Sequence, residues 1–140
     1  MSDKIIYIID DDPIYQVLIN KIIATSGIDY QIVSFKNGRE ALDSLIQAIV
    51  SNNNIPEIIL LDLEMPIMDG WDFMKNVENL FTEQSGKSDI YIITSSISYE
   101  DIERAKTFPE VLGYFPKPVD STKLLEITRK NNVNKDKSNG

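Results

Sequence analysis

Short apolar runs alternate with longer amphipathic segments along the chain of 140 residues. The runs have the length of strands, and in the longer segments apolar residues recur at helical spacing. Strands that alternate with helices are typical of a parallel sheet with helices on both faces. The predicted strands are 4–9, 30–35, 57–61, 90–93 and 113–115. The pattern therefore predicts an α/β fold with five strands and five helices.

Residues that favour helix ends place the helices between these strands. Asp12 followed by Pro13 is typical of a helix start, and Gly27 is typical of a helix end. The first helix carries an apolar stripe at Ile14, Val17, Leu18 and Ile22. The later helices are expected to begin at Asn37-Gly38, to span 70–81, to carry Ile102, Ala105 and Phe108, and to span 121–130.

Polar segments separate these elements and end the chain. Segments 51–56 and 82–89 have the composition of loops. Residues 131–140 include a single apolar residue, too little to offset the entropy of ordering them. We therefore expect one folded domain over residues 1–130, followed by a flexible polar tail over 131–140.

Polar side chains follow four of the predicted strands. The residues at these strand ends are Asp10 and Asp11, Asp62, Thr94, and Lys117. Each has an ordinary structural role when taken singly, and Asp12 is interpreted as a helix cap. In an open parallel sheet, however, ligands bind outside the carboxyl ends of the strands. The combination therefore indicates one shared site.

The chemistry of these groups narrows the kind of site. Two unit charges about 4 Å apart near a protein surface interact by about 4 kcal/mol, so clustered carboxylates repel one another strongly. A hard divalent cation such as Mg²⁺, which prefers oxygen ligands, relieves that repulsion. A lysine ammonium and a threonine hydroxyl suit the oxygens of a phosphoryl group. Asp62 is then a candidate nucleophile that forms an acyl phosphate.

Composition excludes several other kinds of chemistry. The chain has no histidine and no cysteine, which removes the usual general base, the thiol nucleophile and the thiolate zinc site. A net charge of −8 argues against nucleic acid as a ligand. The apolar runs are far shorter than the roughly 18 residues of a membrane span, and the start of the chain does not resemble a secretory signal. We expect a cytoplasmic protein without a membrane partner.

The set of strand-end residues resembles the receiver domain of two-component response regulators, from about Lys4 to Lys130. The resemblance rests on the acidic pair, the segment DLEMPIMDG at 62–70, Thr94, and Lys117 followed by Pro118. It implies a flavodoxin-like (βα)5 fold, a five-stranded doubly wound parallel sheet with strand order 2-1-3-4-5. It also implies that Asp62 accepts a phosphoryl group from a histidine on a sensor histidine kinase or a histidine phosphotransfer protein.

The resemblance assigns a role to each residue of the site. The implied Mg²⁺ ligands are Asp10, Asp11, Asp62 and the backbone carbonyl of Glu64; the implied phosphoryl contacts are Thr94 and Lys117; Pro118 supports them through a cis peptide bond. Tyr114 takes the place of an aromatic switch residue that moves with Thr94, although a half-buried strand tyrosine is the ordinary alternative. Phosphorylation is then expected to shift a population at the face formed by helix four, strand five and helix five.

Two other function classes remain open. A Mg²⁺-dependent phosphatase with an aspartyl nucleophile usually has a second catalytic carboxylate followed by a hydroxyl residue, whereas this chain has Glu64 and then Met65. A receiver-like scaffold that works without phosphorylation typically lacks one of the acid, threonine or lysine groups, and here the set is complete. The favoured reading is a single-domain signalling protein, with self-phosphorylation and self-dephosphorylation as its only chemistry. It would signal to a downstream protein, or pair with a second receiver, through the face formed by helix four, strand five and helix five.

Overall fold

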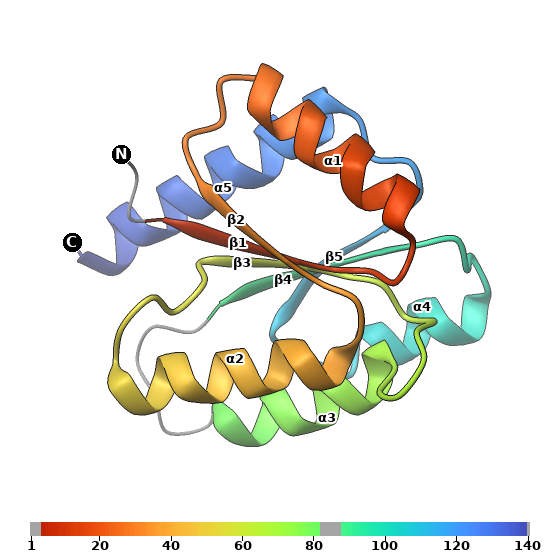
Figure 1. Ribbon diagram of the computed structural model, residues 1–140. Helices are drawn as coiled ribbons and strands as arrows, with labels where there is room; N and C mark the ends of the chain where they lie inside the picture. The colour runs from red at the N-terminus through yellow and green to blue at the C-terminus, as the bar shows by residue number, and fades with distance from the viewer. Residues whose placement is uncertain (1–3, 82–87, 140) are drawn as a thin grey trace.

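The sheet has five parallel strands in the order β2-β1-β3-β4-β5, which confirms the predicted fold class (Figure 1). The structure is a computed structural model that describes the backbone of residues 4–81 and 88–139, and the side chains of these residues up to 133. Most of the predicted loop at 82–89 thus lies outside the described residues. The strands are β1 (Ile5–Ile9), β2 (Gln31–Phe35), β3 (Ile58–Leu61), β4 (Asp89–Thr94) and β5 (Val111–Pro116).

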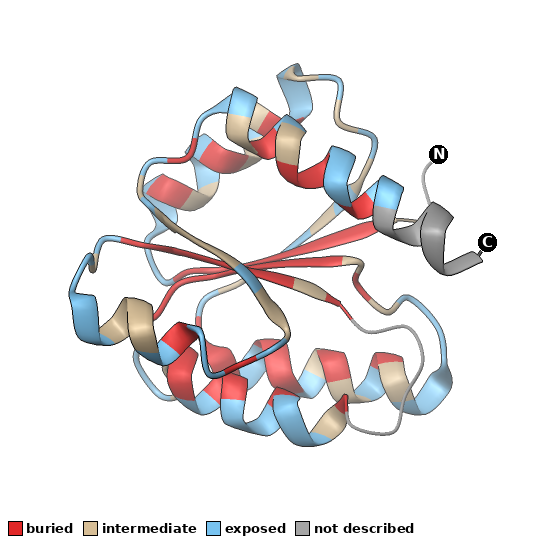
Figure 2. Ribbon diagram, turned by 180° about the vertical axis from the view of Figure 1, so that it is seen from behind, coloured by how far each residue is buried: buried red, intermediate tan, exposed pale blue. Residues whose placement is uncertain are grey.

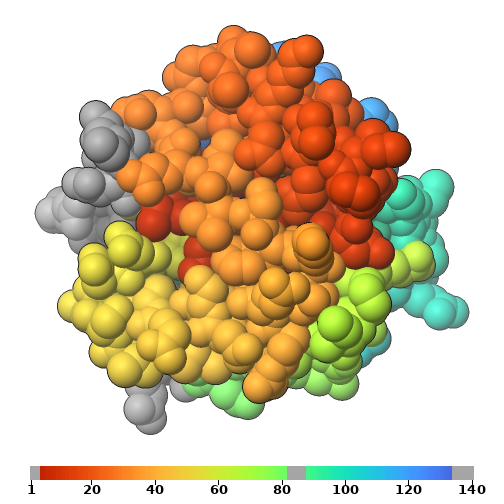
Figure 3. Space-filling view, viewed as in Figure 1, coloured from red at the N-terminus to blue at the C-terminus, as the bar shows by residue number. Residues whose placement is uncertain are grey.

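A helix follows each strand, and the helices cover both faces of the sheet. The helices are α1 (Pro13–Thr25), α2 (Gly38–Ser51), α3 (Gly70–Leu80), α4 (Tyr99–Ala105) and α5 (Ser121–Asn139). Figure 1 shows α1 and α5 on one face, and α2, α3 and α4 on the other. In the same view, Figure 3 shows β2 at the surface between α1 and α2, where it hides most of β1.

Two hydrophobic cores lie on opposite faces of the sheet. Successive residues of β3 alternate between them: Ile58 and Leu60 pack toward α1 and α5, whereas Ile59 and Leu61 pack toward α2 and α3. Every residue of β1 and β3 is buried, while the edge strands β2 and β5 are partly exposed (Figure 2). Burial on both faces explains why the central strands appear in the sequence as unbroken apolar runs.

The buried face of α1 differs from the apolar stripe seen in the sequence. Its buried residues are Tyr15, Ile19 and Ile23. Ile14 and Val17, by contrast, are 79% and 70% exposed. The helix carries apolar residues on two sides, so spacing alone could not choose between them. The Asp12 cap, which accepts hydrogen bonds from the backbone N–H groups of Ile14 and Tyr15, confirms the predicted helix start.

The last helix also differs from its predicted extent. Instead of ending at Lys130, α5 continues to Asn139. The side chain of Asn131 is buried and donates to the Asp89 carboxylate at 2.9 Å, while its amide oxygen accepts from the Tyr30 hydroxyl at 3.0 Å. The predicted end of the last helix at residue 130 is therefore wrong, because the helix continues past it and these long-range hydrogen bonds hold Asn131 beside the residues at the starts of β2 and β4.

Candidate functional site

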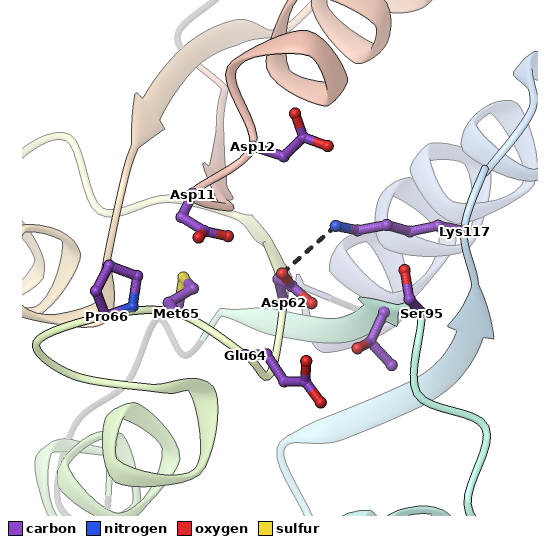
Figure 4. Close-up of a pocket in the computed structure, with 9 residues that line it drawn as sticks. Asp11, Asp12, Asp62, Glu64, Met65, Pro66, Ser95 and Lys117 are labelled. Carbon is purple, nitrogen blue, oxygen red and sulfur yellow. Dashed lines mark hydrogen bonds and ion pairs between the residues drawn. The ribbon is translucent and has the colours of Figure 1, made fainter.

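The predicted site residues meet at the carboxyl ends of four neighbouring strands. Asp10, Asp62 and Thr94 are buried at the ends of β1, β3 and β4, with 2%, 6% and 1% of their surface exposed. Lys117 follows β5. A cavity of about 420 Å³ lies at these strand ends, and Figure 4 shows the residues that line it. Its lining residues are Asp11, Asp12, Asp62, Glu64, Met65, Pro66, Thr94, Ser95 and Lys117.

Three carboxylates lie within reach of a single cation. Asp10, Asp11 and Asp62 each place one carboxylate oxygen within 4.8 Å of the others. The acids differ in burial, because Asp11 is exposed whereas the other two are buried. Such a set of oxygen donors, open to solvent on one side, fits a hard divalent cation that keeps some of its waters. Asp12 is turned away from Asp62 and serves as the helix cap (Figure 4).

A single lysine ammonium group lies between two of the acids. Lys117 Nζ is 2.6 Å from Asp10 Oδ2 and 3.4 Å from Asp62 Oδ2. Figure 4 shows the lysine side chain reaching across the cavity toward Asp62. The peptide bond between Lys117 and Pro118 is cis, as the family resemblance implied.

Burial and charge act against each other on these groups. Burial raises the pKa of the Asp62 carboxyl, although the Lys117 charge and the Thr94 hydroxyl oppose the rise. The pKa of the Asp10 carboxyl is raised by burial too, against a hydrogen bond from Lys117. Burial disfavours the charged form of Lys117, but its hydrogen bond to Asp10 and the charge of Asp62 raise its pKa overall. One ammonium therefore does not fully compensate two buried carboxylates.

The segment after Asp62 brings backbone close to the acid. Gly70 begins α3, and a Cβ atom there would lie 2.5 Å from the backbone oxygen of Asp62. The chain turns tightly at Ile67, which has a φ of 70° and lies between the hydrogen-bonded Pro66 carbonyl and Met68 N–H. This is a strained conformation for a β-branched residue. Glu64 lines the mouth of the cavity with an exposed side chain.

Thr94 and Tyr114 lie at the two ends of a short hydrogen-bonded path. The Thr94 hydroxyl accepts from the backbone N–H of Ser96 at 3.3 Å. The Tyr114 hydroxyl donates to the backbone carbonyl of Ser96 at 2.6 Å. The half-buried Tyr114 side chain is thus directed toward the segment between β4 and α4.

Two residues near the acids were missed in the sequence. The Lys117 ammonium lies 4.6 Å from the centre of the Tyr15 ring. Gln16 Nε2 lies 3.0 Å from the backbone oxygen of Asp10 and 3.1 Å from that of Phe35, and so ties the end of β1 to β2. Both belong to the first helical turn after the acidic pair. That position in the sequence could have indicated that they lie near the site.

Comparisons with known proteins agree with this geometry. The family model of the response regulator receiver domain matches residues 6–129. Sporulation initiation phosphotransferase F of Bacillus subtilis is 28% identical over 130 residues, which cover 93% of this chain and 94% of that protein. The probable methanogenesis regulatory protein FilR2 of Methanothrix harundinacea is 27% identical over 115 residues, covering 82% and 72%.

Solved structures give the same result. A two-component response regulator from Cytophaga hutchinsonii matches with a TM-score of 0.82 and 26% identity, over 91% of this chain and 96% of that chain. The phosphorylated cyanobacterial phytochrome response regulator RcpA matches with a TM-score of 0.70 and 25% identity, over 90% and 89%.

The chain belongs to the response regulator receiver domain family. It is therefore a receiver domain of two-component signalling, and the resemblance inferred from the strand-end residues is confirmed. Within the described part of the chain, no helix has the length and apolar character to cross a membrane.

Proposed function

We propose that this receiver is a phosphorylation-dependent switch in which Asp62 accepts a phosphoryl group. The observation that carries the proposal is the placement of Asp62. It lies at the end of β3 on a cavity wall, 6% exposed, with Lys117 Nζ 3.4 Å from one oxygen. The other oxygen, Oδ1, accepts from the backbone N–H of Leu63 at 2.9 Å, which orients the carboxylate.

The transfer itself needs a nucleophile and compensation of charge. A carboxylate oxygen of Asp62 forms a bond to phosphorus, the bond from phosphorus to the donor nitrogen breaks, and the nitrogen keeps its electron pair. Lys117 and the Thr94 hydroxyl contact the phosphoryl oxygens. Mg²⁺ bound by Asp10, Asp11, Asp62 and the backbone carbonyl of Glu64 would supply further positive charge.

The donor is proposed to be a histidine on a sensor kinase or a phosphotransfer protein. None of the 140 residues is a histidine, so none of them can be the phosphohistidine donor. One relative is named a phosphotransferase, and another was crystallised in phosphorylated form, which supports phosphoryl chemistry in this fold. We also propose a cytoplasmic location. A histidine kinase makes phosphohistidine from ATP, and the receiver must lie in the compartment where that ATP is used.

The signal is proposed to leave through the face formed by α4, β5 and α5. The path from Thr94 to Tyr114 runs through Ser96, whose hydroxyl lies 2.5 Å from an Asp101 carboxylate oxygen at the start of α4. A phosphoryl group that draws the Thr94 hydroxyl inward would change the hydrogen bonds that join Thr94, Ser96 and Tyr114. The face formed by α4, β5 and α5 would then shift its population from one conformation toward another. Leu112, 48% exposed on β5, offers apolar contact to a downstream protein or a second receiver.

The test is incubation with Mg²⁺ and acetyl phosphate, followed by intact mass spectrometry. The wild type should gain one labile phosphoryl group, and Asp62→Asn should gain none because its amide is not nucleophilic. Asp12→Asn is the matched control: it removes a carboxylate from the same cavity, but asparagine caps a helix equally well. This control should be modified like the wild type.

Other outcomes would contradict the proposal. A wild type that takes up no phosphoryl group would favour a scaffold that binds partners without modification. Rapid turnover of many phosphate esters would favour a phosphatase. Modification of Asp62→Asn at the wild-type level would place the acceptor elsewhere.

A further inference from the structure

The ammonium group of Lys117 has three neighbours from three parts of the chain. Two are the Asp10 and Asp62 carboxylates, at 2.6 and 3.4 Å. The third is the aromatic ring of Tyr15 in the first turn of α1, with its centre 4.6 Å from Nζ. A cation at this distance from a ring face is attracted by the ring quadrupole. The lysine side chain is only 15% exposed, so water screens this attraction weakly.

Tyr15 is held firmly in this position. Its side chain is 8% exposed and belongs to the core between the sheet and the helices α1 and α5. Val119, two residues after Lys117, belongs to the same core and is 4% exposed. The backbone N–H of Tyr15 donates to the Asp12 cap at 3.3 Å. The ring therefore supports the segment that carries the lysine.

The neighbours of Lys117 differ in what phosphorylation does to them. Under the proposed function, Asp62 becomes an acyl phosphate and Asp10 binds the metal ion, so both carboxylates acquire other partners. The Tyr15 ring is uncharged and takes part in neither event. It is thus the neighbour, among these three, that the lysine keeps when it turns from Asp10 to the phosphoryl oxygens.

We propose that Tyr15 is a positioning residue for phosphoryl transfer, whose ring holds the Lys117 ammonium over the Asp62 site before and after phosphorylation. The proposal rests on the proposed function of Asp62. It assigns to the first turn of α1 a role in the chemistry, besides its role in packing.

The first test measures the rate of phosphorylation by acetyl phosphate with Mg²⁺. Tyr15→Phe keeps the ring and should react at the wild-type rate. Tyr15→Leu removes the ring and should react about 2- to 30-fold more slowly, the range expected for a partly buried cation–π contact. Tyr91→Leu is the matched control, because Tyr91 is a buried tyrosine of the same core whose ring stacks on Phe115. The control should stay within about twofold of the wild type.

Ring-fluorinated phenylalanines at position 15 keep the shape of the ring but weaken its negative face. The rate should therefore fall with each added fluorine if the ring attracts the ammonium. A role in packing alone predicts no such trend. This series also decides the question if Tyr15→Leu does not fold.

The second test is independent of activity. Side-chain protons of Lys117 near the ring face should resonate upfield in wild type and Tyr15→Phe, and lose this shift in Tyr15→Leu. Lys123, whose ammonium lies 4.5 Å from the centre of the Phe115 ring, is the internal control and should not change. The Lys117 shift should persist when Mg²⁺ and beryllium fluoride occupy the Asp62 site.

Three results would overturn the inference. They are a wild-type rate in Tyr15→Leu, an equal loss of rate in Tyr91→Leu, or disappearance of the Lys117 shift with beryllium fluoride. If the wild type takes up neither phosphoryl group nor beryllium fluoride, the proposed function itself fails. If the wild type reacts and Tyr15→Leu matches it, only the role of Tyr15 fails.

Discussion

At the scale of single residues, the site holds carboxylates whose negative charge is only partly compensated by Lys117. Asp10 and Asp62 are almost fully buried, and they share one ammonium group. Burial raises the pKa of both carboxyls, and Lys117 offsets only part of this effect. These buried charges lower the stability of the folded protein. A bound cation, or a change of Asp62 that removes its negative charge, should therefore raise that stability most.

The first prediction concerns Asp62→Asn. Because burial raises the Asp62 pKa in the folded protein, the folded state binds this proton more tightly than the unfolded chain does. The ionised carboxylate therefore lowers stability at pH values above its folded pKa. The penalty disappears as the pH falls toward the unfolded value of about 3.9. Asp62→Asn should raise the free energy of unfolding at about pH 7 by roughly 1 kcal/mol, since removing the cost of a buried charge is partly offset by the lost ion pair with Lys117.

Urea denaturation between about pH 3 and pH 8 measures this effect, and the gain should shrink toward the acidic end. Asp43→Asn is the control, because that side chain is 59% exposed and pairs with Arg39 on α2. It should change stability by less than about 0.5 kcal/mol at any pH. A wild type more stable than Asp62→Asn at neutral pH would contradict the argument.

At the scale of elements, close contact between backbones sets the geometry of the site. The start of α3 lies directly against the end of β3, since Gly70 donates its N–H to the Leu63 carbonyl at 2.9 Å. A side chain at position 70 would meet backbone atoms of Asp62 and Leu63 at 2.5 and 2.8 Å. Glycine is required here for close approach, and the contact holds the acceptor strand and the next helix together.

Gly70→Ala is therefore expected to displace Asp62. Overpacking of this kind lowers stability by about 1–3 kcal/mol, and we expect slower phosphorylation by acetyl phosphate as well. Gly27→Ala is the matched control: apart from its chain neighbours, no residue that the structure describes has an atom within 4 Å of its Cβ position, and its φ of 74° makes alanine strained there. It should lose about 1 kcal/mol of stability and keep the wild-type rate. Equal rates for both variants and the wild type would show that the contact does not position Asp62.

At the scale of the whole molecule, the order of the strands creates the site. The carboxyl ends of the neighbouring strands β1, β3, β4 and β5 lie side by side. They therefore bring together residues as far apart in the sequence as Asp10 and Lys117. The two cores hold these strands from both faces, so the acids cannot move apart without disrupting the packing. A cation bound only by the folded arrangement should therefore stabilise the entire domain.

Thermal unfolding with and without Mg²⁺ tests this expectation. At about ten times its dissociation constant, Mg²⁺ should add about 1.4 kcal/mol to the free energy of unfolding, and a chelator should reverse the gain. The corresponding rise in Tm is roughly 5 °C for a domain of this size. Asp11→Asn should lose the effect, whereas Asp12→Asn should keep it because its side chain caps α1. Equal Tm values with Mg²⁺ and with chelator would contradict the magnesium proposal.

Much of the fold and of the site could be predicted because it depends on local order. Strand positions, helix starts at Asp12 and Asn37, and the acid, threonine and lysine groups at strand ends follow from spacing and residue type. The meeting of those groups followed from a general property of parallel sheets. The ends of elements were less certain: β5 begins at Val111, and α4 ends before Phe108, which is buried in the segment after it.

The remaining features depend on contacts between segments that are distant along the chain. Ile14 and Tyr15 are both apolar enough to face the sheet. Only the packing of α1 against α5 and β1 decides that Tyr15 is buried and Ile14 is exposed. The same packing brings the Tyr15 ring to Lys117. Asn131 looks like a tail residue until Tyr30 and Asp89 are seen beside it. The order of amino acids therefore established which elements and chemical groups are present, because these depend on neighbours in the chain, while the folded state established which surfaces touch.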